Sequence, residues 1–249
     1  MIGLLLQGVL ETRANFILAA AAVCTVMAMT LVLLMRNSAT ATTRQRLFGA
    51  AWIALVAGVG VWTTHFVAMI GYRPDAALTY DLELTSISIL VGIVFVGLPI
   101  AASEIFRDRL ERMGLGAFTA LGVAGMHLTG MTAVENCLPT YNPLVLTAGI
   151  VISILCFSFA LTRVDTDSKG LLGKAAGIIA GVCSLHFIAM ASVSLNMFDM
   201  GETGIGGVTL SIMVAIVALS VFAATMIGTF NHRRALATGR LQGDDTLVA

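Results

Sequence analysis

Long hydrophobic runs dominate this chain, and polar residues are confined to short stretches between them. Each run has about 20 residues or more, the length that a helix needs to cross a hydrocarbon core of ~30 Å. Barrel strands would instead give short segments of alternating polarity. The pattern predicts an all-α polytopic membrane protein with seven transmembrane helices, at residues 15–35, 48–72, 84–103, 115–134, 144–162, 171–195 and 207–230.

Two shorter segments flank these helices. Residues 1–14 carry apolar side chains at helical spacing, which indicates an amphipathic segment at the membrane interface. Residues 231–249 follow the last run and are expected to form a short cytoplasmic tail. Residues 15–230 then make up one seven-helix membrane domain.

The composition supports a membrane location. Hydrophobic residues make up 58% of the chain and charged residues only 11%, against about 25% charged in an average soluble domain. The net charge is zero, so nothing indicates nucleic-acid binding. Of four cysteines, only Cys137 falls in a polar loop, so we expect no disulfide.

Basic residues follow alternate helices. Most of the 14 lysines and arginines follow the first, third, fifth and seventh predicted helices; those that follow the fifth are Arg163, Lys169 and Lys174. Only Arg13 and Arg73 lie on the other side. Because cytoplasmic loops carry the excess of basic residues, we expect the N-terminus outside and the C-terminus inside.

Three of the four histidines recur in one short pattern. His65, His127 and His186 are separated by 62 and 59 residues, and each is followed four residues later by a methionine. These methionines are Met69, Met131 and Met190. Four residues is just over one helical turn, so each His and its Met share a helix face.

The spacing predicts a repeat of two helices. Three parallel copies comprise the first six helices, with the seventh left over, and each histidine lies roughly 10–14 Å inside the outer end of an even-numbered helix. Parallel membrane repeats place shared sites at their interface. We therefore expect the three histidines to converge on one metal site. Imidazole and thioether donors together favour copper, and imidazole alone also suits zinc.

The segments "WTTHFVAMIGY", "GVAGMHLTGMTAVE" and "GVCSLHFIAMASVSL" resemble the MHYT domain family across residues 14–230. This resemblance implies a seven-helix sensor of the bacterial inner membrane that holds copper near its outer face. It also implies sensing of a diatomic gas (oxygen, carbon monoxide or nitric oxide) and signalling through cytoplasmic cyclase, phosphodiesterase or kinase domains. Because only about 20 residues follow residue 230, three alternatives stay open: the chain is truncated, it signals through a separate cytoplasmic partner, or it does not signal in this way.

The sequence departs from the family pattern in part. The Met before the histidine is kept only at Met126, and the Tyr after it is replaced by Phe66, Leu128 and Phe187. The histidines and the trailing methionines carry over, whereas a phenol role does not.

Two other functions remain open. A membrane zinc hydrolase could use three histidines to activate water, but no carboxylate lies beside them within the predicted helices to act as a general base. A copper transporter would suit the 13 methionines, but no histidine lies in the inner half of the predicted helices. A docking platform without a metal is the remaining alternative.

Overall fold

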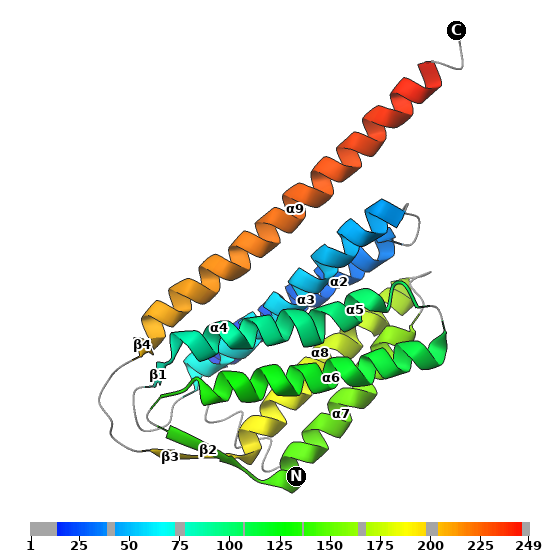
Figure 1. The fold of residues 1–249 in the computed structure, drawn as a ribbon. Coiled ribbons are helices and arrows are strands. Elements are labelled where there is room, and N and C mark those ends of the chain that lie inside the picture. Colours follow the sequence, from blue (N-terminus) through cyan, green and yellow to red (C-terminus); the bar gives the residue numbers. More distant parts are fainter. Residues whose placement is uncertain are drawn as a thin grey trace.

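The computed structural model describes residues 14–38, 43–72, 78–106, 108–135, 137–163, 168–197 and 204–245. Within them the chain is mostly helical, as predicted (Figure 1). The elements are α2 (Ala14–Ser38), α3 (Thr43–Gly71), β1 (Thr79–Tyr80), α4 (Leu82–Val91), η1 (Gly92–Gly97), α5 (Leu98–Ala102), α6 (Arg109–Thr132), β2 (Cys137–Tyr141), α7 (Pro143–Thr162), α8 (Ser168–Ser192), β3 (Val193–Met197), β4 (Ile205–Gly206) and α9 (Gly207–Asp245). The predicted interfacial segment, apart from Ala14, lies outside the described residues.

Six helical segments of the described chain are long and apolar enough to cross a membrane. They are α2, α3, the continuous segment α4–η1–α5, α7, α8 and the first part of α9. The remaining helix, α6, has 24 residues but a less apolar sequence, because it carries charges in its first turn and several glycines along its length. A seventh crossing by α6 therefore remains a prediction, as does the orientation of the termini.

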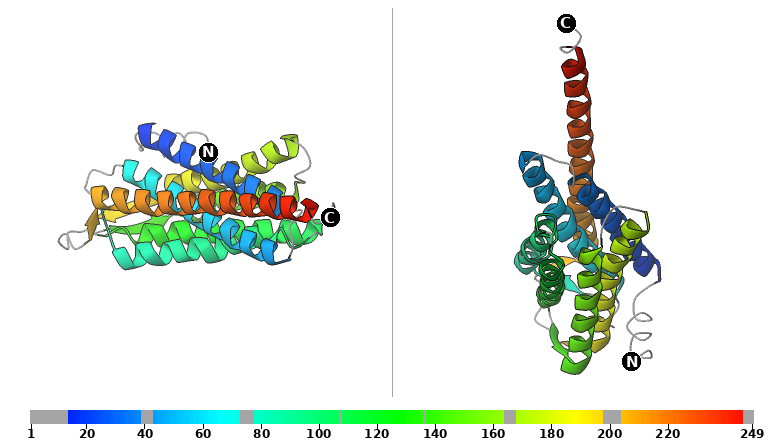
Figure 2. Two further views of the ribbon diagram at one scale, coloured as in Figure 1. Left: turned by 90° about the horizontal axis from the view of Figure 1, so that it is seen from above. Right: turned by 90° about the vertical axis from the view of Figure 1, so that its right-hand side faces the viewer.

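The helices form one bundle. α2 packs on α3 and α8, α6 lies against α7 and the α4–η1–α5 segment, and α7 packs on α8. α9 contacts α3 on one side of the bundle and continues as a single helix to Asp245, well past the ends of the other helices (Figure 2). The tail predicted at residues 231–249 thus begins as a continuation of this helix.

Two short antiparallel ribbons close one end of the bundle. β1 pairs with β4, and β2 pairs with β3 in a register that places Cys137 opposite Met197 and Tyr141 opposite Val193. The sequence predicted helix as far as residue 195. The structure ends α8 at Ser192, because the next five residues pair with β2.

A turn of π-helix, η1, interrupts the third crossing. It is held close to two neighbouring helices by glycines. A side chain at Gly58 of α3 would meet the backbone of Ile93 at 2.4 Å, and one at Gly122 of α6 would meet the carbonyl of Phe95 at 2.1 Å. Small residues let membrane helices approach in this way.

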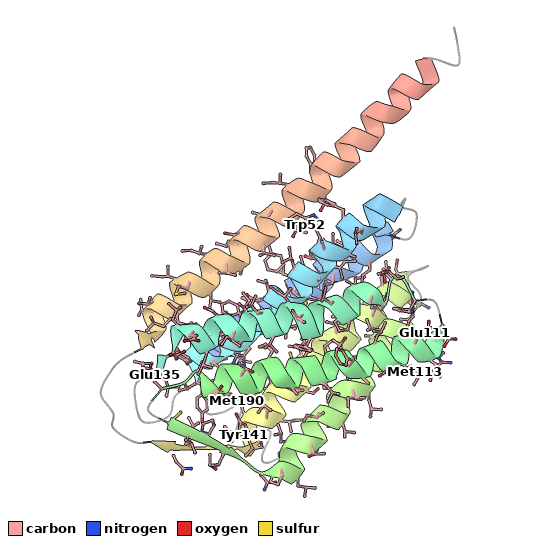
Figure 3. The ribbon with its side chains drawn as sticks, in the orientation of Figure 1. Trp52, Glu111, Met113, Glu135, Tyr141 and Met190 are labelled. Atoms are coloured by element: carbon pink, nitrogen blue, oxygen red, sulfur yellow. The ribbon has the colours of Figure 1, made fainter. Side chains whose placement is uncertain are left out.

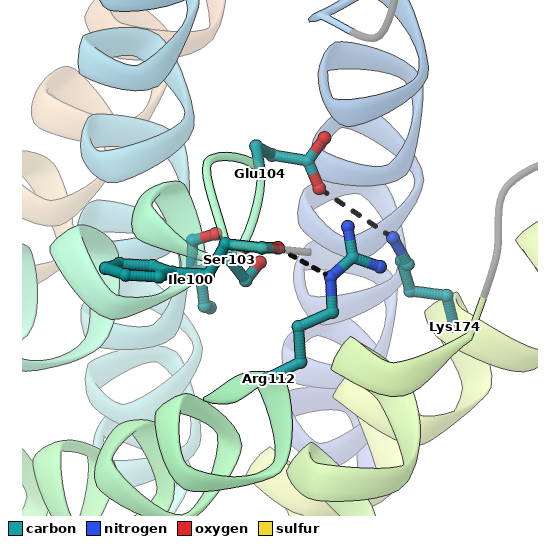
Figure 4. A network of polar contacts seen from close by, with 6 residues as sticks. Ile100, Ser103, Glu104, Arg112 and Lys174 are labelled. Atoms are coloured by element: carbon teal, nitrogen blue, oxygen red, sulfur yellow. Dashed lines mark hydrogen bonds and ion pairs between the residues drawn. The ribbon is translucent and has the colours of Figure 1, made fainter. Parts of the chain in front are cut away.

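The opposite end of the bundle contains a buried charge pair. Lys174 of α8 is 1% exposed, and its Nζ lies 3.9 Å from Oε1 of Glu104, in the turn after α5 (Figure 4). Next to this pair, Nε of Arg112 donates to the carbonyl of Phe106 at 3.0 Å. The sequence grouped Lys174 with the basic residues that follow the fifth predicted helix, whereas the structure buries its side chain between elements.

Candidate metal centre

The three repeated histidines meet inside the bundle. His65, His127 and His186 lie on α3, α6 and α8, five or six residues before the last residue of each helix. These three helices end beside the ribbons, so the histidines share one depth near that end (Figure 1). All three side chains are buried. The convergence predicted from sequence spacing is therefore present.

The ring nitrogens converge closely. Nδ1 of His65 lies 3.1 Å from Nδ1 of His127 and 3.3 Å from Nδ1 of His186. Ligand atoms from the three rings all fall within 4.8 Å of one another. The rings are nearly perpendicular, with interplanar angles of 78° to 86°. The rings thus meet edge to face instead of stacking, and their nitrogens lie around a common centre.

This geometry fits a metal ion. Imidazole nitrogens at about 2.0–2.1 Å from a tetrahedral metal lie about 3.3–3.4 Å apart, close to the two nitrogen separations. Without an ion, Nδ1 of His65 could make a well-aligned hydrogen bond with only one of its two neighbours, because a neutral ring nitrogen carries either one proton or one lone pair. In addition, Nε2 of His65 and of His127 are buried without a hydrogen-bond partner among the described residues. Unsatisfied buried polar atoms are rare in proteins and call for an explanation.

A small cavity adjoins the rings. Besides the histidines it is lined by Thr64, Met126 and four apolar side chains, Val61, Val123, Val182 and Leu185. Met126 thus forms part of the cavity wall. Its position next to His127 gave only a weak sequence indication, since neighbours on a helix point about 100° apart.

The trailing methionines are buried near the site. Met69, Met131 and Met190 are 1%, 0% and 4% exposed. They belong to the same packed core, but the wall of the cavity is formed by Met126. Their role as ligands remains a prediction.

Glu135, an acidic group at the ribbon end, makes contacts away from the cavity. Oε2 of Glu135 accepts a hydrogen bond from Thr79 at 3.2 Å, beside the backbone of Gly204. Figure 3 shows Glu135, Met190 and Tyr141 toward the ribbon end, and Glu111 and Met113 at the far end of α6. Burial raises the pKa of the Tyr80 and Tyr141 phenols above their ordinary value, so both stay neutral. No carboxylate lines the cavity among the described residues.

Comparison with known proteins agrees with this arrangement. The sequence profile of the family described as "MHYT: Bacterial signalling protein N terminal repeat" matches residues 58–117, 121–177 and 180–239. The chain belongs to the MHYT family. Each matched copy begins six or seven residues before one of the three histidines.

Several signalling proteins are similar to this MHYT chain. "Bifunctional diguanylate cyclase/cyclic di-GMP phosphodiesterase MucR" of Pseudomonas aeruginosa is 30% identical over 193 residues, 70% of this chain and 27% of that protein. "Cyclic di-GMP phosphodiesterase NbdA" of the same species is 30% identical over 164 residues, 59% and 20% of the two chains. "Signaling protein YkoW" of Bacillus subtilis is 26% identical over 168 residues, 61% and 20%. The chain thus spans about a fifth to a quarter of these relatives' length. No solved structure matches it.

The MHYT profile divides the repeats differently from the sequence interpretation. We paired the first helix with the second and left the seventh over. The profile instead joins the histidine-bearing part of α3 to the segment α4–η1–α5, α6 to α7, and α8 to α9, which leaves α2 outside the repeats. Seven helices can be paired starting from the first helix or from the second. In either division each copy contains one of the three histidines.

Proposed function

We propose that this chain is an integral membrane sensor module that binds one copper ion through His65, His127 and His186. The observation that supports it most strongly is the convergence of three Nδ1 atoms from three helices within the bundle. Neutral imidazole is a common metal ligand. The thioether of Met126 at the cavity wall, and the buried Met69, Met131 and Met190, favour a soft metal such as copper over zinc.

The proposed signal is a diatomic gas or the redox state of the metal. Three nitrogen ligands leave a coordination position open, as in metal sites that accept a further small ligand. The site joins helices of three repeats, so a change in its ligation would alter how α3, α6 and α8 pack. Such a change is a signal only if the two packing states differ in ligand affinity.

The proposed output lies on the cytoplasmic side. The relatives named as cyclase or phosphodiesterase are four to five times longer than the matched region. For this chain we propose a signalling partner in the cytoplasm, reached from the bacterial inner membrane through the end of α9. The continuous helix to Asp245 provides a rigid connection for it.

Metal content per chain tests the proposal. We compare detergent-purified wild type with the triple variant His65→Ala, His127→Ala, His186→Ala, by mass spectrometry after loading with copper or zinc. His232→Ala is the matched control, because His232 is the fourth histidine and lies in the last part of α9. We expect close to one copper per wild-type and control chain, and a loss of at least tenfold in the triple variant.

Other outcomes would favour a different function or no metal at all. Stoichiometric zinc with little copper would favour the hydrolase, although no carboxylate lines the cavity among the described residues to act as its base. Copper uptake into vesicles that depends on the three histidines would favour the transporter. Wild type that stays metal-free after loading would leave the histidines as helix-packing groups.

A further inference from the structure

A groove of about 300 Å³ opens between α2 and α9, at the end of the bundle away from the ribbons. Both helices pack on α3, and the groove lies between them. Leu33 and Leu34 form part of its α2 side, and Met226 and Phe230 part of its α9 side. Leu33, Met226 and Phe230 are exposed. Because these residues belong to segments able to cross a membrane, the groove opens toward lipid.

The lining of the groove favours hydrocarbon over a polar solute. Its three hydroxyl groups, on Thr30, Thr225 and Thr229, each donate to a backbone carbonyl four residues earlier in the same helix. Their protons are therefore used within the helices, and the other lining side chains are apolar. The volume is at the lower end of the range for small-molecule sites, roughly 300–1,000 Å³. An acyl chain suits such a groove, because it needs no hydrogen bonds.

Trp52 of α3 indicates the depth of the groove in the membrane. A Cβ atom at Gly228 of α9, between the lining residues Met226 and Phe230, would come within 3.3 Å of the Trp52 ring, and Figure 3 shows Trp52 beside α9. Tryptophan is enriched where the hydrocarbon meets the headgroups. The two crossing segments also end here, at Arg36 and Phe230. This end of the groove therefore lies at headgroup depth.

Positive charge gathers at the same end of the groove. Arg36 is exposed in the last turn of α2. Arg233 and Arg234 lie on the next turn of α9 beyond the groove. The sequences of α2, of α3 and of α9 before Asp244 contain no acidic residue that could balance these arginines. The three helices around the groove thus offer a positively charged end to an anion.

We propose that the groove binds an acyl chain of an anionic phospholipid and that Arg36 holds its phosphate. Guanidinium groups bind phosphate through paired, charge-assisted hydrogen bonds, and Arg233 and Arg234 add positive charge near the membrane surface. The lipid fills the space between α2 and α9 where α9 leaves the bundle. A second copy of the chain suits this place less well, because a parallel α9 would bring the same arginines together.

The lipid site is separate from the proposed metal centre. Trp52 precedes His65 by thirteen residues, about 20 Å along α3. A test of lipid binding therefore does not depend on whether the histidines hold a metal.

Native mass spectrometry tests the proposal on the full chain. We remove lipid from the detergent-purified protein and add dioleoyl phosphatidylglycerol or dioleoyl phosphatidylcholine, which carry the same acyl chains on an anionic and a net neutral headgroup. We expect one phosphatidylglycerol to bind at least tenfold more tightly than phosphatidylcholine, since each arginine near an anionic headgroup contributes about fivefold. Equal affinities, or a lipid-free dimer, would overturn the proposal.

Charge variants locate the headgroup. Arg36→Gln, Arg233→Gln and Arg234→Gln combined in one chain should lower the affinity for phosphatidylglycerol at least tenfold and leave that for phosphatidylcholine unchanged. Arg109→Gln is the matched control, because Arg109 is exposed at the start of α6 and does not line the groove. Equal losses in the two chains would show that the preference comes from overall charge and would contradict a headgroup site at Arg36.

A bulky side chain tests the groove itself. Thr229→Trp places a ring in the groove and should weaken the binding of phosphatidylglycerol at least tenfold. Leu219→Trp is its control, because Leu219 is exposed on α9 and does not line the groove. A Thr229→Trp chain that binds phosphatidylglycerol as wild type does would place the lipid elsewhere and refute the proposal. Circular dichroism verifies the helix content of each variant, and copper content measured on the same samples reports on the metal centre separately.

Discussion

At the scale of single residues, the metal site depends on room made by a glycine. A Cβ atom at Gly130 of α6 would come within 2.6 Å of Nε2 of His65 and within 3.0 Å of its Cδ2. The imidazole ring therefore lies directly against the α6 backbone, and its orientation depends on the missing side chain.

We expect Gly130→Ala to weaken metal binding while the protein still folds. The added methyl must displace the ring of His65, which rotates Nδ1 away from the other two histidines. Changing a group that orients a metal ligand typically lowers the metal affinity by about 10–100-fold. A titration of copper against a chelator of known affinity measures the loss.

Gly125→Ala provides the control on the same helix. A Cβ atom there would meet only Cγ1 of Val91, at 3.8 Å, an ordinary contact. This variant should bind copper as wild type does. Equal affinities for the two variants would contradict the positioning role of Gly130.

The residues of the site differ in how well the sequence predicted them. His65, His127 and His186 were predicted because each occupies the same place in a repeat, and a repeat fixes helix, depth and face together. Met126 carried only a weak signal, because its position depends on the rotation of α6 in the bundle.

At the scale of elements, the helices could be predicted from hydrophobic runs, but the connections could not. The five apolar and polar residues of β3 look like the end of a helix in sequence, and only pairing with β2 makes them a strand. The π-turn η1 likewise follows from close contact with Gly58 and Gly122 on two other helices. Such features depend on neighbours that are distant in sequence.

The buried pair between Lys174 and Glu104 links two elements at the end of the bundle away from the ribbons (Figure 4). We expect Lys174→Met to lower stability by about 3 kcal/mol, because removing one partner leaves the other charge poorly compensated in a buried position. The midpoint of thermal unfolding in detergent, followed by circular dichroism, measures this loss.

Two comparisons separate the pair from general effects of the substitution. The double variant Lys174→Met, Glu104→Gln removes both charges and should recover most of the loss. Lys169→Met changes an exposed lysine of the same helix and should shift stability by less than about 0.5 kcal/mol. A Lys174→Met variant as stable as Lys169→Met would show that the pair contributes little.

At the scale of the whole molecule, the number of membrane crossings depends on α6. Six segments have the apolar character of a crossing, and α6 does not, because it carries charges in its first turn and its buried face includes several glycines, Thr119 and His127. Yet it lies within the bundle beside α7, and His127 has the same depth as the other two histidines. A helix that is shielded by its neighbours needs less apolar surface than one that faces lipid.

We therefore predict that the two ends of α6 lie on opposite sides of the membrane. Glu111 is exposed in its first turn and Thr140 is exposed in β2, beyond its last turn, and Figure 3 shows Glu111 at the end of the bundle far from the ribbons. In a chain whose four cysteines are replaced by serine, Thr140→Cys should react with a membrane-impermeant maleimide in intact spheroplasts. Glu111→Cys should react only after the membrane is permeabilised.

Seven crossings with the N-terminus outside require this pattern, since the turn before α6 is then cytoplasmic and the ribbons are external. Labelling of both positions from the same side would leave α6 as a helix that does not cross, and the reverse pattern would keep the crossing but invert the orientation. Lys169 is exposed at the start of α8. Lys169→Cys distinguishes these outcomes, because it must be labelled from the same side as Glu111→Cys if α6 and α7 both cross.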